Sequence, residues 1–281
     1  MIARSTHGPV PGDRLRQGVR RRMRTKDLRM RDVTVLVAMA LLVGSCAPAA
    51  QPAPEASIAV RTTPAGGTAS ASPPGDDLCA SGREQSPIDL SGAEAADLPE
   101  IAFSYEPSTL RIVDTGSTVQ NPFDPGSAMT IGDTRWELVQ LHYHAPSEHR
   151  DDGRSFPIEF HLVHRDDDTG DLAVVALFGR VGAENPALAT TVANLPDVTG
   201  EEVVVSGETL DASDLLPESR ETIRYPGSLT TPPCAEGVRW NVLTQPIEVS
   251  QAQLDAYTEV HDDNGRAIQP ANGRVPLIDR G

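Results

Sequence analysis

Three histidines stand at strand-like spacings in the middle of the chain. His142 and His144 alternate within the run Leu138–His144, and His161 lies in a second run of this kind, Glu159–Val163. Side chains alternate between the two faces of a strand, so two neighbouring strands can point all three imidazoles at one place. Three neutral nitrogen ligands and one open position are the ligand set of a catalytic zinc site. The pattern therefore predicts a β-sheet that joins these strands, with Zn²⁺ as the cofactor.

The residues beside these histidines support a metal site. A metal-bound histidine needs a hydrogen-bond acceptor for its other ring nitrogen. Gln140 and Glu159 stand two residues before the first and the third of these histidines, on the same strand faces, and are predicted to be such acceptors. His164 lies on the opposite strand face and His149 follows a predicted turn, so both are interpreted as structural.

A cupin-type metal site is the main alternative. The pattern His142-x-His144-x-x-x-Glu148 fits the first motif of the cupin barrels, which bind iron or manganese. That motif needs flanking glycines, and here Trp136 and Ser155 occupy the two positions. The second half of the cupin motif is also missing after the third histidine, which makes this alternative the weaker one.

The N-terminal region is typical of an export signal. A stretch rich in arginine precedes the apolar run Val33–Val43, which is too short to span a bilayer as a helix, and Gly44-Ser45-Cys46 follows. We interpret residues 1–46 as a signal peptide with a sequence that resembles a lipobox, in which Cys46 is lipidated and becomes the mature N-terminus. An ordinary cleaved signal with a chance cysteine is the alternative. The expected location is extracytoplasmic, with a lipid anchor in the bacterial cell membrane.

The mature chain is strongly acidic. Residues 1–46 contain ten of the 24 basic residues, Lys26 among them as the only lysine, and three of the 40 acidic residues, so residues 47–281 carry a net charge of −23. Such a surface repels nucleic acid and anionic lipid, so neither is an expected partner and the membrane is reached only through the lipid anchor. A small neutral substrate is unaffected by this charge.

The remaining sequence divides into a tether and one domain. Residues 47–75 are rich in Ala, Pro, Ser and Thr and predict a flexible tether, whereas residues 76–281 are long enough for one domain with a core. Helices are predicted at Asn185–Ala193 and, behind a Ser250 cap, at Gln251–Val260. Strands are predicted at Leu110–Val113, Trp136–His144, Ile158–His164, Leu172–Gly179, Glu202–Val205 and Val238–Leu243. Turns are predicted between them at Asn121-Pro122, Asp151–Gly153 and Pro226-Gly227.

Cys79 and Cys234 are the pair left once Cys46 is assigned to the lipid. In an oxidising compartment they are expected to form a disulfide, which closes most of the domain and is worth about 5 kcal/mol in the chain-entropy model. Two buried thiols are the alternative.

Several segments together resemble the α-class carbonic anhydrases. The resemblance implies a single mostly β domain, built on a large twisted and mainly antiparallel sheet with a few short helices, with zinc at the base of a conical cleft. It implies reversible hydration of CO₂ to bicarbonate and a proton, by attack of zinc-bound hydroxide on CO₂. The matching segments keep the family's order over nearly all of residues 79–276: Gln85–Asp89, Gln140–His149, Glu159–His164, Leu172–Gly182, Tyr225–Pro233, Trp240 and Asn264–Arg274.

The resemblance also implies roles for single residues. Thr230 would accept the hydrogen of the attacking hydroxide and donate its own hydroxyl to Glu148, and Thr231 would contact substrate. The backbone carbonyl of Asn264 would accept a hydrogen bond from His144. The two mature cysteines match the disulfide of exported members. An apolar wall for CO₂ would consist of Val163, Val174, Leu229, Val238 and Trp240.

The chain also departs from the family pattern. Ser117 stands where fast members have a cleft histidine that shuttles protons, and serine does not exchange protons near neutral pH. We therefore predict that proton transfer limits turnover and depends on added buffer. The family's N-terminal segment with Trp and Tyr is also absent before Cys79.

Two other functions compete with the enzyme. A non-catalytic binding module is disfavoured because the three histidines, Thr230 and Glu148 are all present. A zinc-scavenging lipoprotein would need more surface ligands, for which Arg165–Asp168 is a weak candidate. Oligomeric state, and whether another divalent metal can replace zinc, stay open.

Overall fold

A computed structural model describes residues 78–280 of the protein. The predicted signal peptide, the lipidation site Cys46 and the tether all lie outside the described residues. No helix in the described part of the chain has the length and the apolar character that a membrane crossing requires.

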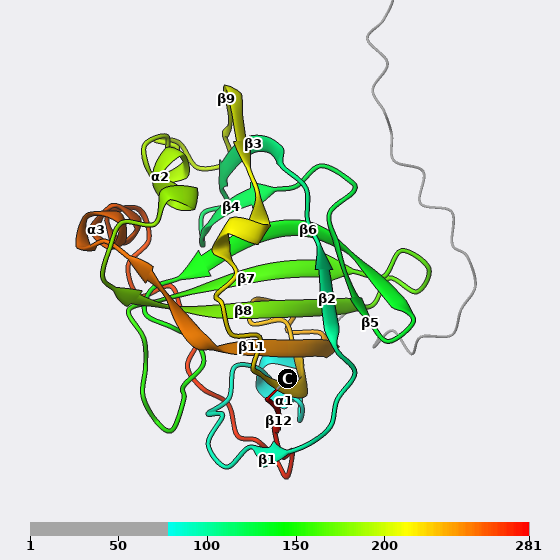
Figure 1. Ribbon diagram of the computed structural model, residues 1–281. Helices are drawn as coiled ribbons and strands as arrows, with labels where there is room; N and C mark the ends of the chain where they lie inside the picture. The colour runs from blue at the N-terminus through cyan, green and yellow to red at the C-terminus, as the bar shows by residue number, and fades with distance from the viewer. Residues whose placement is uncertain (1–77, 281) are drawn as a thin grey trace, which may run out of the picture. The chain divides into compact units, whose positions relative to one another are not determined.

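One twisted sheet dominates residues 78–280 (Figure 1). Its main path runs β1-β12-β10-β11-β8-β7-β6-β4-β3-β9, while β5 pairs with β6 and β2. Neighbours are antiparallel except for β8 with β11 and β1 with β12, so the prediction of a large, mainly antiparallel sheet is confirmed. The strands are β1 (Glu94–Ala95), β2 (Ile101–Ser104), β3 (Ser108–Asp114), β4 (Val119–Pro122), β5 (Ala128–Ile131), β6 (Thr134–His144), β7 (Ile158–Arg165), β8 (Leu172–Val181), β9 (Glu202–Leu210), β10 (Thr222–Ser228), β11 (Glu236–Val249) and β12 (Leu277–Asp279).

The helices are short and begin at well-formed caps. They are α1 (Leu78–Ser81), α2 (Pro186–Val192), α3 (Gln251–Val260) and the 3₁₀ helix η1 (Ala212–Leu215). The Asn185 side chain accepts the N–H of Ala187 at the start of α2, and Ser250 forms a capping box with Gln253 at the start of α3. Gln253 also exchanges two hydrogen bonds of 2.8 Å with the backbone of Asn185, which ties the starts of α2 and α3 together. Both helix predictions are confirmed.

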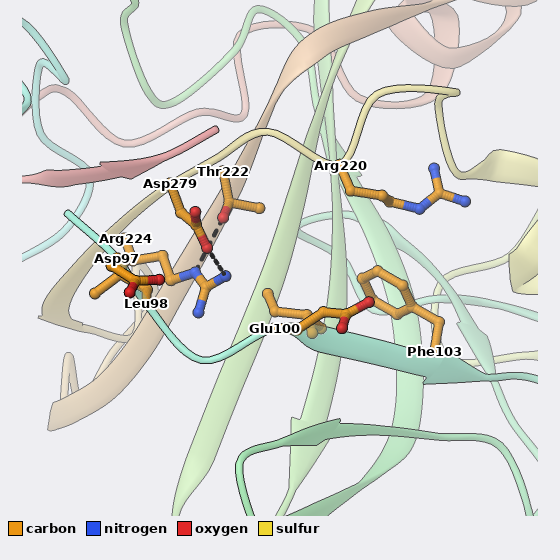
Figure 2. Close-up of a pocket in the computed structure, with 9 residues that line it drawn as sticks. Asp97, Leu98, Glu100, Phe103, Arg220, Thr222, Arg224 and Asp279 are labelled. Carbon is orange, nitrogen blue, oxygen red and sulfur yellow. Dashed lines mark hydrogen bonds and ion pairs between the residues drawn. The ribbon is translucent and has the colours of Figure 1, made fainter. Parts of the chain in front are cut away.

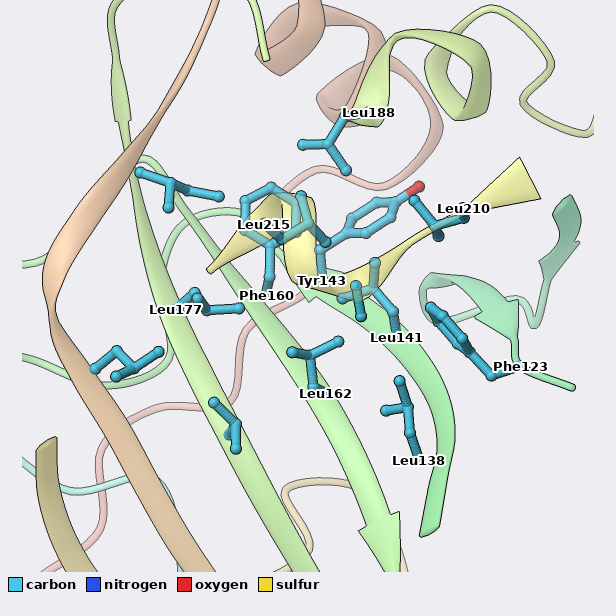
Figure 3. Close-up of a cluster of buried hydrophobic side chains, with 14 of the residues drawn as sticks. Phe123, Leu138, Leu141, Tyr143, Phe160, Leu162, Leu177, Leu188, Leu210 and Leu215 are labelled. Atoms are coloured by element: carbon cyan, nitrogen blue, oxygen red, sulfur yellow. The ribbon is translucent and has the colours of Figure 1, made fainter. Parts of the chain in front are cut away.

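The central strands are buried on both faces, and their alternation separates two apolar clusters. In β7, Phe160 and Leu162 enter a cluster under α2, where Leu188 points toward Tyr143 (Figure 3). The next residue, Val163, lies on the other face in a second cluster. His161 shares that second face because strand residues two apart point the same way. The first cluster therefore forms a core behind the strands, and the face opposite it carries the histidine.

Two turn predictions were wrong. Turns were predicted at Asn121-Pro122 and Pro226-Gly227, but these residues lie in β4 and β10. Proline lacks an N–H and is tolerated in a strand where one edge is unpaired. Among the described strands, only β11 pairs with β10 beyond Arg224, and only β6 pairs with β4 at Pro122, so each proline lacks a strand partner on one side.

The predicted pair of cysteines forms a disulfide. Cys79 in α1 is bonded to Cys234, which lies just before β11, and their Cα atoms are 5.0 Å apart. The bond joins the start of the described chain to the loop that follows β10. This loop contains Thr230 and Thr231.

Candidate metal centre

The three predicted ligands come from two adjacent antiparallel strands. His142 of β6 is the Cα partner of His161 of β7, and His144 stands two residues further along β6. The alternation of side chains then places all three rings on one face, with ring centroids 4.9 to 5.1 Å apart. The structure therefore brings together the three histidines that the spacing selected.

Each of the three rings has one nitrogen bonded to the protein and one directed inward. The inward nitrogens, one from each ring, lie within 4.8 Å of one another. Two of them, His142 Nε2 and His161 Nδ1, are 3.2 Å apart. The outer contacts are His142 Nδ1 to Gln140 Oε1 at 2.9 Å, His144 Nδ1 to the Asn264 carbonyl at 3.2 Å, and His161 Nε2 to Glu159 Oε1 at 2.8 Å.

This donor set fits a zinc ion. His144 Nε2 is buried and makes no hydrogen bond within residues 78–280, as expected of a nitrogen that binds a metal. Burial holds the pKa of His142 well below its usual value, and the neighbouring His161 and His144 lower it further. Burial also lowers the pKa of His144. Neutral imidazoles are the form that binds metal, and three of them leave a fourth tetrahedral position open.

A second group of possible ligands is closed by its own hydrogen bonds. It consists of His149, Glu159 and His161. The His149 Nδ1 atom lies 2.6 Å from Glu159 Oε1, and the backbone N–H of His149 donates to Glu159 Oε2 at 2.8 Å. The Nε2 atom of His149 lies 2.6 Å from the hydroxyl of Tyr225. His149 therefore has a structural role, because it fixes the Glu159 carboxylate that is bonded to His161.

Glu148 lies next to the triad with its two carboxylate oxygens in different surroundings. Oε1 accepts the backbone N–H of Arg266 at 2.8 Å. Oε2 is buried, makes no hydrogen bond among the described residues, and lies 3.6 Å from His144 Nε2. The hydrogen bond from Thr230 to Glu148 that the resemblance implies is therefore not formed in this structure. Thr230 is partly buried in the loop after β10.

The residues of the expected CO₂ wall share one apolar cluster beside the third histidine. Val163 and Val174 are Cα partners on β7 and β8, and the ring of Trp240 has its centroid 4.9 Å from that of His161. The Trp240 indole donates to the carbonyl of Ser228, which fixes its plane. The members that were predicted are Val163, Val174, Val238 and Trp240, all buried, and Leu229, which is partly buried against them.

The two remaining predicted positions are exposed. Ser117 lies in the turn between β3 and β4, and its carbonyl accepts the side-chain N–H of Asn264 at 3.0 Å. Since the Asn264 carbonyl also accepts from His144, Ser117 is one residue removed from the triad. Thr231 is exposed in the loop before the disulfide.

A separate hollow of about 430 Å³ lies between β2, β10 and β12 (Figure 2). Arg224 is bonded there to Thr222, to the Pro99 carbonyl and to Asp279, and the Arg220 guanidinium lies 5.8 Å from the centre of the Phe103 ring. None of the predicted site residues lines this hollow. The hollow is therefore separate from the three histidines.

The fold and the site together define a β-sheet protein with three histidines that could hold a metal ion and an apolar cluster beside them. The family described as eukaryotic-type carbonic anhydrase matches residues 74–276, and the chain belongs to this family. The predictions of an α-class carbonic anhydrase and of a carbonic anhydrase enzyme are thereby confirmed. The reaction of this family is the reversible hydration of CO₂ to bicarbonate and a proton.

Several known proteins are similar to the chain over the same region. A carbonic anhydrase of the cyanobacterium Nostoc is 40% identical over 205 residues, which are 71% of this chain and 77% of the relative. A hyperthermostable carbonic anhydrase from a hydrothermal vent chimney is 39% identical with a TM-score of 0.69, over 72% of this chain and 90% of that one. The α-carbonic anhydrase of Thermovibrio ammonificans, solved with the inhibitor sulfanilamide, is 38% identical with a TM-score of 0.69, over 71% and 89%.

Proposed function

We propose that the chain hydrates CO₂ reversibly at a Zn²⁺ ion held by His142 Nε2, His144 Nε2 and His161 Nδ1. The observation that supports this proposal is that each ring has one nitrogen hydrogen-bonded to the protein, while its other nitrogen faces the other two histidines. Bound zinc lowers the pKa of a coordinated water to about 7, so a nucleophile exists at neutral pH.

Thr230 and Glu148 are proposed to aim that nucleophile. An ionised carboxylate only accepts hydrogen bonds, so a hydroxyl bonded to it must donate. The free Oε2 of Glu148 is the acceptor we assign to Thr230, which leaves the lone pairs of the Thr230 oxygen for the hydrogen of the nucleophile.

The apolar wall is proposed to receive CO₂. CO₂ has no net dipole and gains little from polar contacts, so an apolar surface beside the triad holds it without competing for the nucleophile. Trp240 and Val163 are supported in this role by their positions next to His161. Thr231, exposed in the following loop, is assigned a contact with CO₂ or bicarbonate.

Ser117 is proposed to leave the enzyme without its own proton carrier. Each turnover releases a proton, and a serine hydroxyl is not ionised near pH 7. The backbone carbonyl of Ser117 is linked to the triad through Asn264, and the serine side chain has no group that carries a proton near pH 7. Buffer molecules would then carry the proton to solvent.

The lipid anchor stays a proposal that rests on the sequence. The lipobox-like Gly44-Ser45-Cys46 after an apolar run supports export and lipidation at Cys46. We propose that the enzyme acts outside the cytoplasmic membrane on CO₂ and bicarbonate, with the membrane reached only through the anchor. Metabolic labelling with a fatty-acid analogue tests this, since Cys46→Ala should abolish the label and an unchanged label would contradict it.

The catalytic proposal is tested by stopped-flow CO₂ hydration. We expect the rate of the purified enzyme to fall to background after zinc is removed with a chelator and to return when zinc is added back. His161→Ala should stay at background in both conditions. Equal rates in all of these samples would reject the proposal.

A further inference from the structure

Arg266 connects the carboxylate of Glu148 to the N-terminal part of the domain. It lies in the loop between α3 and β12, and its backbone N–H donates to Glu148 Oε1 at 2.8 Å. The neighbouring Gly265 packs so closely on the Glu148 segment that an added Cβ would lie 3.0 Å from the Pro146 carbonyl and 3.4 Å from Glu148 Cγ. The loop therefore has little freedom to shift without moving Glu148.

The side chain of Arg266 holds that loop in place. Its Nη1 donates to Gln85 Oε1 at 3.0 Å and to the Ser86 carbonyl at 2.7 Å, and its Nη2 donates to the Cys79 carbonyl at 2.9 Å. Hydrogen bonds from a charged donor are the stronger kind, and three of them spread over one planar group fix its orientation.

The acceptors of Arg266 are themselves rigid. Ser86 and Ser228 exchange two hydrogen bonds, from each backbone N–H to the other hydroxyl, at 2.9 and 3.0 Å. Cys79 is held by its disulfide to Cys234, whose carbonyl accepts from the Gln85 side chain at 3.0 Å. The guanidinium is thus anchored to a segment fixed at both ends.

We propose that Arg266 is a positioning residue for the hydration reaction, which sets the orientation of the Glu148 carboxylate. Its backbone N–H bonds to Oε1, and Oε2, which has no hydrogen-bond partner among the described residues, is the acceptor assigned to Thr230. Without the guanidinium bonds, the loop relaxes and the carboxylate rotates, so the aim of the nucleophile is lost. The role rests on the proposed function of Thr230 and Glu148.

Arg274 supplies a matched control. It binds the same N-terminal segment, with Nη2 donating to the Gln85 carbonyl at 2.8 Å and Nη1 to the Pro226 carbonyl at 2.9 Å. Among the described residues, Arg274 donates only to backbone carbonyls and makes no hydrogen bond to Glu148, so its loss removes a clamp of similar chemistry without touching that carboxylate.

The test compares Arg266→Ala and Arg274→Ala on folded, zinc-loaded protein. We expect Arg266→Ala to lower kcat for CO₂ hydration about tenfold with KM little changed, and Arg274→Ala to stay within about twofold of wild type. Combining Arg266→Ala with Glu148→Gln should add little to the loss from Glu148→Gln alone, because both act on one carboxylate. Equal kcat in the two arginine variants, or losses that multiply with Glu148→Gln, would overturn the proposal.

A crystal structure of Arg266→Ala separates this inference from the proposed function. We expect the Glu148 carboxylate to leave the orientation in which Oε1 accepts the N–H of residue 266. An unchanged orientation would overturn the positioning role whether or not the wild type is active. An inactive, zinc-loaded wild type would instead reject the proposed function.

Discussion

Glu159 Oε1 lies 2.8 Å from His161 Nε2, so the Nδ1 atom of His161 faces the other two histidines. The first two histidines use their Nε2 atoms instead, because their Nδ1 atoms are bonded to Gln140 and to the backbone of Asn264. The same Glu159 oxygen lies 2.6 Å from His149 Nδ1, which prevents the carboxylate from turning away. The ring nitrogen that His161 turns toward the other two histidines is therefore set by the Glu159 side chain.

Glu159→Gln should weaken zinc binding. The glutamine amide oxygen is a poorer hydrogen-bond acceptor than the carboxylate. Its NH₂ group would also face either the backbone N–H of His149 or the ring nitrogens of His149 and His161. We expect zinc affinity to fall by about 10- to 100-fold, measured by competition with a chromophoric chelator. Glu137→Gln is the control, since Glu137 is bonded to Arg135 and Gly126 elsewhere on the sheet. Unchanged affinity in Glu159→Gln would contradict the assigned role.

Ser117→His should accelerate turnover in dilute buffer. A histidine at this position titrates near neutral pH and can pass protons to solvent. We expect the hydration rate of the wild type to rise with imidazole concentration, and that of Ser117→His to be about tenfold higher in dilute buffer and less dependent on imidazole. Ser117→Ala should behave as the wild type. A fast wild type that ignores imidazole would refute the prediction.

Thr230→Ala and Glu148→Gln should each lower kcat, by about 100-fold. The two side chains are proposed to act as one unit, so the double variant should be no slower than the slower single variant. Stopped-flow rates on protein with full zinc content give this comparison. Independent losses that multiply in the double variant would show that the two residues do not share a hydrogen-bonded chain.

His164 should make the domain sensitive to acid. Burial lowers its pKa from 6.5 to about 3, and its Nε2 lies 2.9 Å from the hydroxyl of Tyr105. Below pH 6.5 the unfolded chain takes up a proton that the folded chain does not take up until about pH 3. The free energy of unfolding is therefore fully retained above pH 6.5 and falls as the pH drops from 6.5 toward 3, by a few kcal/mol.

His164→Gln tests this prediction. Glutamine keeps a polar partner for Tyr105 but does not titrate, so the loss of stability between pH 6.5 and 4 should be smaller than in the wild type. Urea unfolding at several pH values measures the difference. Acid release of zinc affects both proteins equally, so parallel pH curves would mean that His164 is not responsible.

The sequence predicted local features better than long-range contacts. Alternation in β6 and β7 was enough to place the three histidines on one face, and the Ser250 cap marked the start of α3. The strands that contain Pro122 and Pro226 were missed because their open edges depend on which strands lie beside them. Proline in a single sequence gives no sign of such an edge.

The missed site residues act through contacts between distant parts of the chain. Tyr225 lies 76 residues from His149 and Arg266 lies 118 residues from Glu148, and no spacing rule links such pairs. Ser86, Tyr225 and Arg266 all stand in segments that match the family, but the match alone gave them no role. The backbone N–H of Arg266 could not have been identified from residue type, because every residue except proline has one.

The central claim is that His142, His144 and His161 hold one zinc ion. A crystal structure of the zinc-loaded protein, with anomalous scattering measured at the zinc edge, tests it most directly. We expect one anomalous peak about 2.0–2.1 Å from His142 Nε2, His144 Nε2 and His161 Nδ1, with a water at the fourth position. A peak at His149 and Glu159, or no peak in a protein that still hydrates CO₂, would contradict the account.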